Sequence, residues 1–374
     1  MNDSIPTARP LAIVYCEGQF NQFDGKTANG LVRSSERYAI HAVIDSTLAG
    51  QDAGMVLDGA DVDIPIVADL EAALALPGAP QALIFGLAPL SGLMEGADRA
   101  TVLDAVHAGL DVVAGLHEFM GDDQEIAGAA KQMGVALHDV RRPRPTKDLR
   151  MFDGAIANVD CVRIAILGTD GAIGKRTTAT VLTAALNGAG IHTIMVGTGQ
   201  TGIMQGARYG VALDAIPSQF AIGELEGEML AAFGERPQVI VVEGQGALSH
   251  PAYLSSTMIL RGTRPDGVIL QHAPARQFLS DYPDVPMPAP GPEIELIEMF
   301  GKTRVIGITI NHEGMERDEV DRVATGYATQ FEIPATDALW HAPGALVAMV
   351  TEAFPQLVPV AARPSDPQAT TENR

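Results

Sequence analysis

The alternation of short apolar runs with helix-length segments constrains the fold of this 374-residue chain more than any other feature. In the first half, runs such as "LAIVYC", "YAIHAVID" and "QALIFG" are separated by segments of helical spacing, for example "DRATVLDAVHAG". A second series runs from "CVRIAILG" through "HTIMVGTG", "PQVIVVEGQG" and "GVILQH" to "RVIGITINH". Strands separated by helices pair in parallel through right-handed crossovers, so we predict an α/β protein with two doubly wound sheets.

The length of the chain is sufficient for two cores, and a basic, proline-broken segment separates the two series. This segment, "RRPRPTKDLR" at 141–150, is typical of a linker, whether solvated or facing an anionic ligand between the domains. We predict a Rossmann-like domain over 1–145, a P-loop NTPase-like domain over 146–360 and a flexible tail over 361–374. The proline-rich stretch at 282–295 is predicted to be a surface loop.

Composition limits the partners and the location of the protein. The formal net charge of −21 disfavours binding to nucleic acid phosphates and to anionic lipid surfaces. No apolar run approaches the ~18–20 residues of a membrane span, and the N-terminal segment lacks the features of a leader, so we expect a cytoplasmic protein. The two cysteines, Cys16 and Cys161, lie at the edges of predicted strands and are expected to be small core residues.

The stretch "AILGTDGAIGKRTT" predicts a phosphate-binding loop. An apolar strand ends there, glycines permit a tight turn, and a helix begins at Lys175. Backbone N–H groups and the helix dipole attract anions without adding net charge, and the lysine adds a point charge. The residues predicted to bind a phosphorylated cofactor are Gly168, Thr169, Asp170, Gly171, Gly174, Lys175, Arg176 and Thr177.

The residue after the lysine departs from the pattern of nucleotide hydrolases. Those enzymes place a hydroxyl there to bind Mg²⁺, whereas this chain has Arg176. The change favours a loop that grips a phosphorylated cofactor over one that hydrolyses ATP, although a Thr177 side chain turned inward would keep Mg-ATP binding open. Because no zinc motif is present either, we expect no metal.

Polar side chains at the ends of predicted strands are candidates for the chemistry. Glu243 ends the apolar run "VIVVE", where partial desolvation raises a carboxyl pKa toward the range of a general base; the alternative is an acid that orients a metal or a turn. His250 and His272 are each consistent with a general base, a substrate contact or a structural hydrogen bond. Arg276 is consistent with binding a substrate carboxylate or with an exposed position on the surface. We take as catalytic candidates Glu243, His250 and Lys175, and as substrate contacts Gln200, Thr201, Arg208, Gln245, His272 and Arg276.

Several motifs together resemble one family. They are "VIDSTLAGQDAG" and "GLHEF" in the first half, and "GTDGAIGKRTTA", "GTGQTG", "VVEGQGALSHPAY" and "PDGVILQHAPAR" in the second. The resemblance covers roughly 11–355. The family was long catalogued as a domain of unknown function, with a Rossmann-like N-terminal half and a phosphate-loop C-terminal half. The long spacing of the loop and the strand end "VEGQG" are also similar to dethiobiotin synthetase.

The resemblance implies D-glutamate N-acetyltransferase activity with acetyl-CoA as co-substrate, in the catabolism of D-amino acids. The loop would then hold the phosphates of coenzyme A, and Glu243 or His250 would deprotonate the substrate amine. Two alternatives stay open: an ATP- and Mg²⁺-dependent ligase or kinase of the dethiobiotin synthetase type, and a non-catalytic module that binds CoA or a nucleotide. For all three functions we expect small-molecule substrates and a homo-oligomer, with no nucleic acid or membrane partner.

Overall fold

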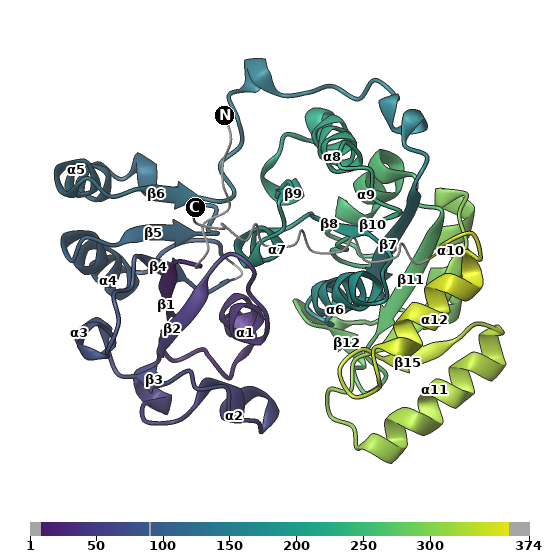
Figure 1. Ribbon diagram of the computed structural model, residues 1–374, viewed down its shortest axis with the longest axis horizontal. Helices are drawn as coiled ribbons and strands as arrows, with labels where there is room; N and C mark the ends of the chain where they lie inside the picture. Colours follow the sequence, from purple (N-terminus) through teal and green to yellow (C-terminus); the bar gives the residue numbers. More distant parts are fainter. Residues whose placement is uncertain (1–8, 90, 359–374) are drawn as a thin grey trace, which may run out of the picture.

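The computed structural model describes residues 9–89 and 91–358, and the predicted flexible tail at 361–374 lies outside the described residues. Two parallel sheets lie side by side, one in each half of the chain, with helices packed around each (Figure 1). The predicted α/β fold with two doubly wound sheets is confirmed.

The first sheet has six strands in the order β3-β2-β1-β4-β5-β6, all of them parallel. The strand order reverses between β1 and β4, and ligands of open α/β sheets bind outside the strand ends at such a point. The strands are β1 (Leu11–Tyr15), β2 (Ala39–Ile44), β3 (Ile66–Val67), β4 (Ala82–Phe85), β5 (Asp111–Ala114) and β6 (Leu137–Asp139), and the helices are α1 (Lys26–Arg33), α2 (Ala53–Asp58), α3 (Leu70–Ala75), α4 (Gly96–His107) and α5 (Gln124–Met133).

The second sheet has seven parallel strands in the order β15-β14-β11-β7-β10-β8-β9, with β7 at its centre. The strands are β7 (Val162–Gly168), β8 (Thr193–Gly197), β9 (Tyr209–Gly210), β10 (Val239–Val242), β11 (Gly267–His272), β14 (Val305–Ile310) and β15 (Ala335–Asp337). The helices are α6 (Lys175–Gly188), α7 (Gln200–Gln205), α8 (Ser218–Phe233), α9 (Ser255–Thr263), α10 (Pro290–Gly301), α11 (Arg317–Phe331) and α12 (Gly344–Ala353).

The central strand β7 shows why the apolar runs predicted buried strands. Ala165 and Leu167 belong to the core on one face of the second sheet, whereas Ile164 and Ile166 belong to the core on the other face. Successive side chains of a strand point to opposite faces, and both faces of a parallel sheet are covered by helices. The positions of β7 from Ile164 to Leu167 are therefore all apolar, with Arg163 as a charged residue near its start, and the run reads as continuous in the sequence.

The prediction of a surface loop at 282–295 is wrong. Strand β13 (Tyr282–Pro286) pairs antiparallel with β12 (Phe278–Leu279) in a ribbon separate from the main sheet, and α10 starts at Pro290. Proline is tolerated in the first turn of a helix, because the missing N–H would have no partner there. A two-stranded ribbon likewise leaves one side of each strand unpaired, so prolines do not prevent it.

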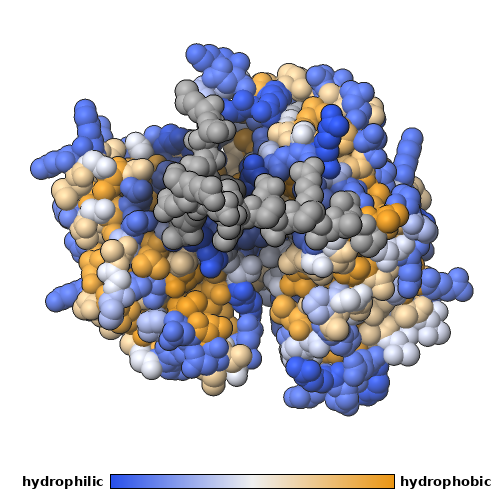
Figure 2. All heavy atoms as spheres, in the orientation of Figure 1, coloured by the Kyte–Doolittle hydropathy of each residue, from blue (hydrophilic) through white to orange (hydrophobic). Residues whose placement is uncertain are grey.

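The two halves are joined by side chains as well as by the linker. The Thr27 and Thr201 hydroxyls are 2.7 Å apart, which links α1 to α7. In the linker, Arg141 pairs with Asp214 at 2.7 Å and Arg144 pairs with the buried Glu224 on α8 at 2.6 Å. A notch between the two halves is visible at the lower edge of the molecule (Figure 2).

Among the residues described, none of the helices combines the length and the apolar character that crossing a membrane requires.

Candidate active site between the two domains

The loop between β7 and α6 has the backbone of an anion-binding turn. Ala172 and Gly174 both have positive φ, 47° and 96°, and Gly174 precedes the helix without a side-chain cap. In the part of the chain that the structure describes, the backbone N–H groups of residues 172–177 donate to no acceptor. Unpaired amides at a helix N-terminus form a ready anion site, since the helix dipole adds to their partial charges.

Buried contacts hold this loop in place from behind. The Asp170 carboxylate is fully buried, pairs with Arg276 at 2.8 Å and accepts the Ser280 amide at 2.8 Å. The Thr169 hydroxyl lies 2.9 Å from Nδ1 of His272, and burial lowers the pKa of that histidine to about 4. The Asp170 charge and the Thr169 hydroxyl are thus satisfied within the protein, which makes these residues a support for the loop.

A cavity of 790 Å³ opens in front of the loop and is shared by both halves of the chain. It contains five of the residues predicted to bind the cofactor, whereas Gly168, Thr169 and Asp170 lie behind it. It also contains four of the six predicted substrate contacts. The predicted residues that line the cavity are Gly171, Gly174, Lys175, Arg176, Thr177, Gln200, Thr201, Glu243, Gln245 and Arg276.

Lys175, the first residue of α6, supplies the positive charge of the loop. Its side chain is buried, and its ammonium donates to the backbone carbonyl of Asp170. Burial lowers the pKa of Lys175 to about 8. Within the described residues no carboxylate lies within 4.0 Å of this ammonium, so its charge is available to an anion at the loop.

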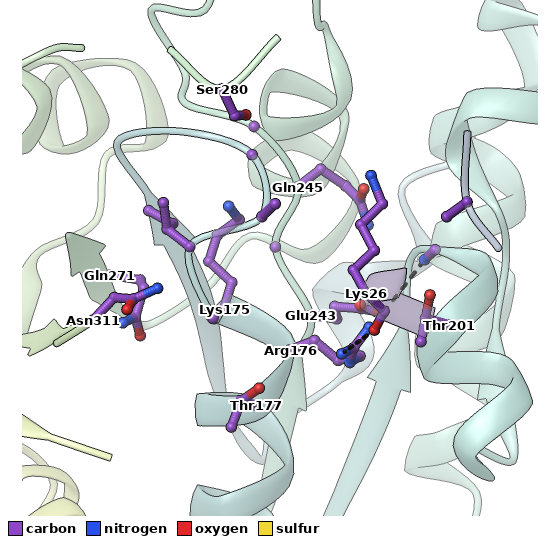
Figure 3. Close-up of a pocket in the computed structure, with 18 of the residues that line it drawn as sticks. Lys26, Lys175, Arg176, Thr177, Thr201, Glu243, Gln245, Gln271, Ser280 and Asn311 are labelled. Atoms are coloured by element: carbon purple, nitrogen blue, oxygen red, sulfur yellow. Dashed lines mark hydrogen bonds between the residues drawn. The ribbon is translucent and has the colours of Figure 1, made fainter. Parts of the chain in front are cut away.

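Arg176 extends away from the loop to the first domain. Its guanidinium donates to the Lys26 carbonyl of α1 at 3.3 Å. Figure 3 shows the guanidinium next to that carbonyl and beside Glu243. A Cβ at Gly30 would lie 2.5 Å from the guanidinium, so a larger residue at this position of α1 would require Arg176 to move. The position that carries a metal-binding hydroxyl in hydrolases is therefore used here for the contact between domains.

Glu243 follows β10 directly and is 4% exposed. Its carboxylate accepts the amides of Thr198 at 3.0 Å and Gly199 at 3.4 Å. Burial raises the pKa of the Glu243 carboxyl, and the positive charge of Arg176 and the two amides oppose this shift. A buried carboxylate at a cavity wall with a raised pKa has the properties of a general base.

His250, the other predicted base, lies behind the cavity wall. Its Nδ1 accepts the amides of Ala252 and Tyr253, both at 3.2 Å, and its ring stacks on Tyr253 with centroids 4.3 Å apart. The proton of the neutral ring therefore resides on Nε2, which is buried without a partner among the described residues. Since the basic lone pair is occupied and burial lowers the pKa of His250, the geometry favours Glu243 as the base.

Two predicted substrate contacts do not reach the cavity. Arg208 is 73% exposed and pairs with Glu235 at 3.0 Å, on the surface next to β9. His272 lies in the supporting layer behind the loop. Exposed arginines and strand-end histidines are not distinguished from ligand-binding ones by sequence spacing alone.

The cavity also contains residues that we did not single out in the sequence. The first domain contributes Lys26, Asn29 and Arg33 from α1, of which Lys26 lies in the turn region "CEGQFNQFDGKTA" and the other two follow it. The second domain contributes His312, whose Nδ1 lies 2.8 Å from Asp337 and whose ring stacks on Trp340.

Comparisons with known proteins agree with this architecture. Residues 150–347 match the P-loop domain of the DUF1611 family, described as a domain of unknown function, and residues 46–143 match its Rossmann-like N-terminal domain. A crystal structure of a DUF1611 family protein from Anabaena variabilis is 30% identical. It superposes with a TM-score of 0.85 and covers 92% of this chain and 100% of that one.

Two curated relatives are named D-glutamate N-acetyltransferase. The relative from Tritonibacter scottomollicae is 30% identical over 271 residues, which cover 71% of this chain and 79% of the relative. The relative from a Pseudoalteromonas species is 26% identical over 271 residues, which cover 71% of this chain and 80% of the relative. As the motifs indicated, this chain belongs to the DUF1611 family.

Proposed function

We propose that this protein is an N-acetyltransferase that transfers the acetyl group of acetyl-CoA to the amino group of D-glutamate. The names of the two relatives support the reaction and the acceptor. The observation that carries the proposal is the loop at residues 172–177, because its unpaired amides face the same cavity as a buried carboxylate. A phosphate cradle and a general base in one cavity suit a phosphorylated acyl donor and an amine acceptor.

In this proposal the loop binds the phosphates of the donor. Coenzyme A carries several phosphate oxygens, and the amides, the dipole of α6 and the Lys175 ammonium all attract them. These groups compensate for the net charge of −21, which would otherwise repel an anionic donor. The thioester would then reach into the cavity toward the strand ends of the second sheet.

Glu243 acts on the acceptor. The carboxylate takes one proton from the substrate ammonium, and the free amine attacks the thioester carbonyl to form a tetrahedral intermediate. Backbone amides of a glycine loop at the strand ends stabilise the oxyanion, and the intermediate collapses by breaking the C–S bond. The amine loses its second proton, the thiolate of coenzyme A is protonated, and one proton is released overall.

A second candidate is an ATP- and Mg²⁺-dependent ligase or kinase, since Thr177 lines the cavity and Glu243 lies where related loops place a metal-facing acid. A binding module without turnover is the third. The two enzymatic alternatives differ in product: the transferase releases a thiol, whereas the ligase releases ADP.

The test is thiol release from acetyl-CoA, followed with a disulfide dye. The protein is mixed with acetyl-CoA and D-glutamate, then with L-glutamate, and finally with Mg-ATP in place of acetyl-CoA. Thiol release that depends on D-glutamate supports the proposal. ADP formation without thiol would favour the ligase, and a CoA-dependent rise in melting temperature without any product would favour the binding module.

A further inference from the structure

The first domain places one lysine at the cavity where Asp281 and Asp24 act on its charge only from beyond ion-pair distance. Lys26 begins α1, lines the cavity and is partly buried. Among the described residues, no carboxylate lies within 4.0 Å of its ammonium, and its nearest defined contact is the ring of Phe23 at 4.9 Å. An ammonium withdrawn from water without a counter-ion is costly, so this position favours an anion from outside the protein.

Other cations at the cavity already have carboxylate partners. Arg33 pairs with Asp58 at 2.7 Å, and Arg141 pairs with Asp214 at 2.7 Å. Arg276 is held between Asp170 at 2.8 Å and Glu313 at 2.5 Å. In the described part of the chain this leaves the two lysines and Arg176, whose Nε is buried without a partner.

The remaining cations lie at two different places in the cavity. Lys175 belongs to the loop with the unpaired amides, whereas Lys26 and Arg176 lie where α1 meets the second domain (Figure 3). The Arg176 side chain points to the Lys26 carbonyl, and its positive charge acts on the Glu243 carboxyl. The donor phosphates and a second anion can therefore be bound at the same time.

The position of Lys26 relative to Glu243 indicates which part of an acceptor it meets. Figure 3 shows the Lys26 ammonium pointing away from Glu243, although both side chains line the same cavity. An amine at Glu243 would bring the attached α-carboxylate close to Arg176. A carboxylate further along the acceptor side chain would extend toward the lysine.

We propose that Lys26 binds the side-chain carboxylate of the acceptor, so that the first domain determines the preference for an acidic amino acid. This inference rests on the proposed acetyl transfer and extends it to the source of acceptor specificity. Lys26 acts on binding and not on bond formation. Its loss should therefore raise KM for the acceptor and leave the KM for acetyl-CoA nearly unchanged.

The test compares Lys26→Met and Lys26→Arg with wild type, using D-glutamate and D-glutamine as acceptors. D-Glutamine retains the α-carboxylate but lacks the side-chain charge. A charge-assisted hydrogen bond predicts that Lys26→Met lowers kcat/KM for D-glutamate by about 10- to 100-fold, while Lys26→Arg retains most of it. For D-glutamine, which the inference predicts to be a poor acceptor of the wild type, the Lys26→Met change should have less than a threefold effect. Lys131→Met, at an exposed lysine on α5, is the matched control for the loss of one charge.

Equal losses with both acceptors, or a rise only in the KM for acetyl-CoA, would overturn the inference. Calorimetric titration of D-glutamate into wild type and Lys26→Met in the presence of CoA tests the role of Lys26 in binding independently of the proposed reaction. Binding that depends on Lys26 supports the inference even if no acetyl group is transferred. Unchanged binding by the folded variant, or no binding by wild type, contradicts it.

Discussion

The turns after β1 and β7 occupy equivalent places, each at the carboxyl end of a central parallel strand, but they are built from different groups. After β7 the chain lines the cavity, and within the described ranges the amides of residues 172–177 have no hydrogen-bond acceptor. After β1 the chain folds on itself: the Gln19, Gln22 and Gly25 amides donate within the turn, and the Phe20 amide donates to Asp45 at 3.0 Å. The turn after β7 therefore offers a continuous run of main-chain donors, whereas the turn after β1 uses several of its amides internally and contributes the charged side chain of Lys26 to the cavity.

With the proposed function, this contrast would give different tasks to the two halves of the chain. Main-chain amides suit phosphate groups, whose oxygens are the same in every nucleotide-like donor. A side chain is better suited to recognise a substrate, since a single substitution changes its charge or length. The same architecture thus supports both tasks through its loops, and function has to be argued from the loops.

The largest effect is expected at Glu243, the proposed base. Glu243→Gln should lower kcat by about 10²- to 10⁴-fold, because the amide cannot accept the proton of the ammonium. Steady-state thiol release at saturating substrates measures this. Glu235→Gln, at a surface acid outside the cavity, is the control, and a Glu243→Gln variant with wild-type kcat would remove Glu243 from the mechanism.

The same variant has a stability signature. A carboxyl whose pKa is raised by burial stabilises the fold while it is neutral, and loses this contribution as pH rises through its folded pKa. Glu243→Gln should therefore melt at the same or a higher temperature than wild type at pH 7. The difference should shrink toward pH 4, as measured by thermal unfolding at both values.

The second effect in size separates the two turns directly. Lys175→Ala should raise KM for acetyl-CoA by about 10- to 100-fold and change KM for D-glutamate by less than threefold, because one charge-assisted contact to phosphate is lost. Lys26→Met should show the opposite split. Parallel changes of both constants in both variants would contradict the division of tasks between the halves.

A smaller effect follows from the acidity of Lys175. Because burial lowers its pKa to about 8, the free enzyme loses this positive charge as pH rises through that value. We expect kcat/KM for acetyl-CoA to fall up to tenfold per pH unit above pH 8, and the fall should shift to higher pH in Lys175→Arg. A profile measured at saturating D-glutamate that stays flat to pH 9.5 would argue against a role for this ammonium.

The smallest effect is expected at a residue that the sequence had suggested. Arg208→Ala should leave kcat and both KM values within twofold of wild type, since Arg208 pairs with Glu235 on the surface outside the cavity. A selective rise in KM for D-glutamate would mean that the acceptor extends beyond the cavity toward β9.

The fold was predictable from sequence because its signals are local and repeated. β11 matches the run "GVILQH" at both ends, and the helix after the loop starts at Lys175 as predicted. The two-residue strands β3 and β9 were not predicted, because two residues are too short to show an alternating pattern of apolar and polar side chains.

The site was predictable only in part, for a different reason. Glycine spacing identified the loop, and the charge after an apolar run identified Glu243. Which side chains turn toward the cavity depends on tertiary contacts, as His250 and Arg208 illustrate. Lys26 had no local signal, since its meaning comes from packing against a segment about 150 residues later in the chain.

The arginines of the linker have a mechanical consequence. Arg144 and the Arg150 amide both contact Glu224 on α8, while Arg141 contacts Asp214 and the Gly115 carbonyl at the other end. The linker is therefore fixed to the domains at two points, and we expect it to be stiff. A hinge motion between the domains that widened the cavity would first have to break these ion pairs. The resistance to such a motion is therefore electrostatic, and we expect it to decrease as ionic strength increases.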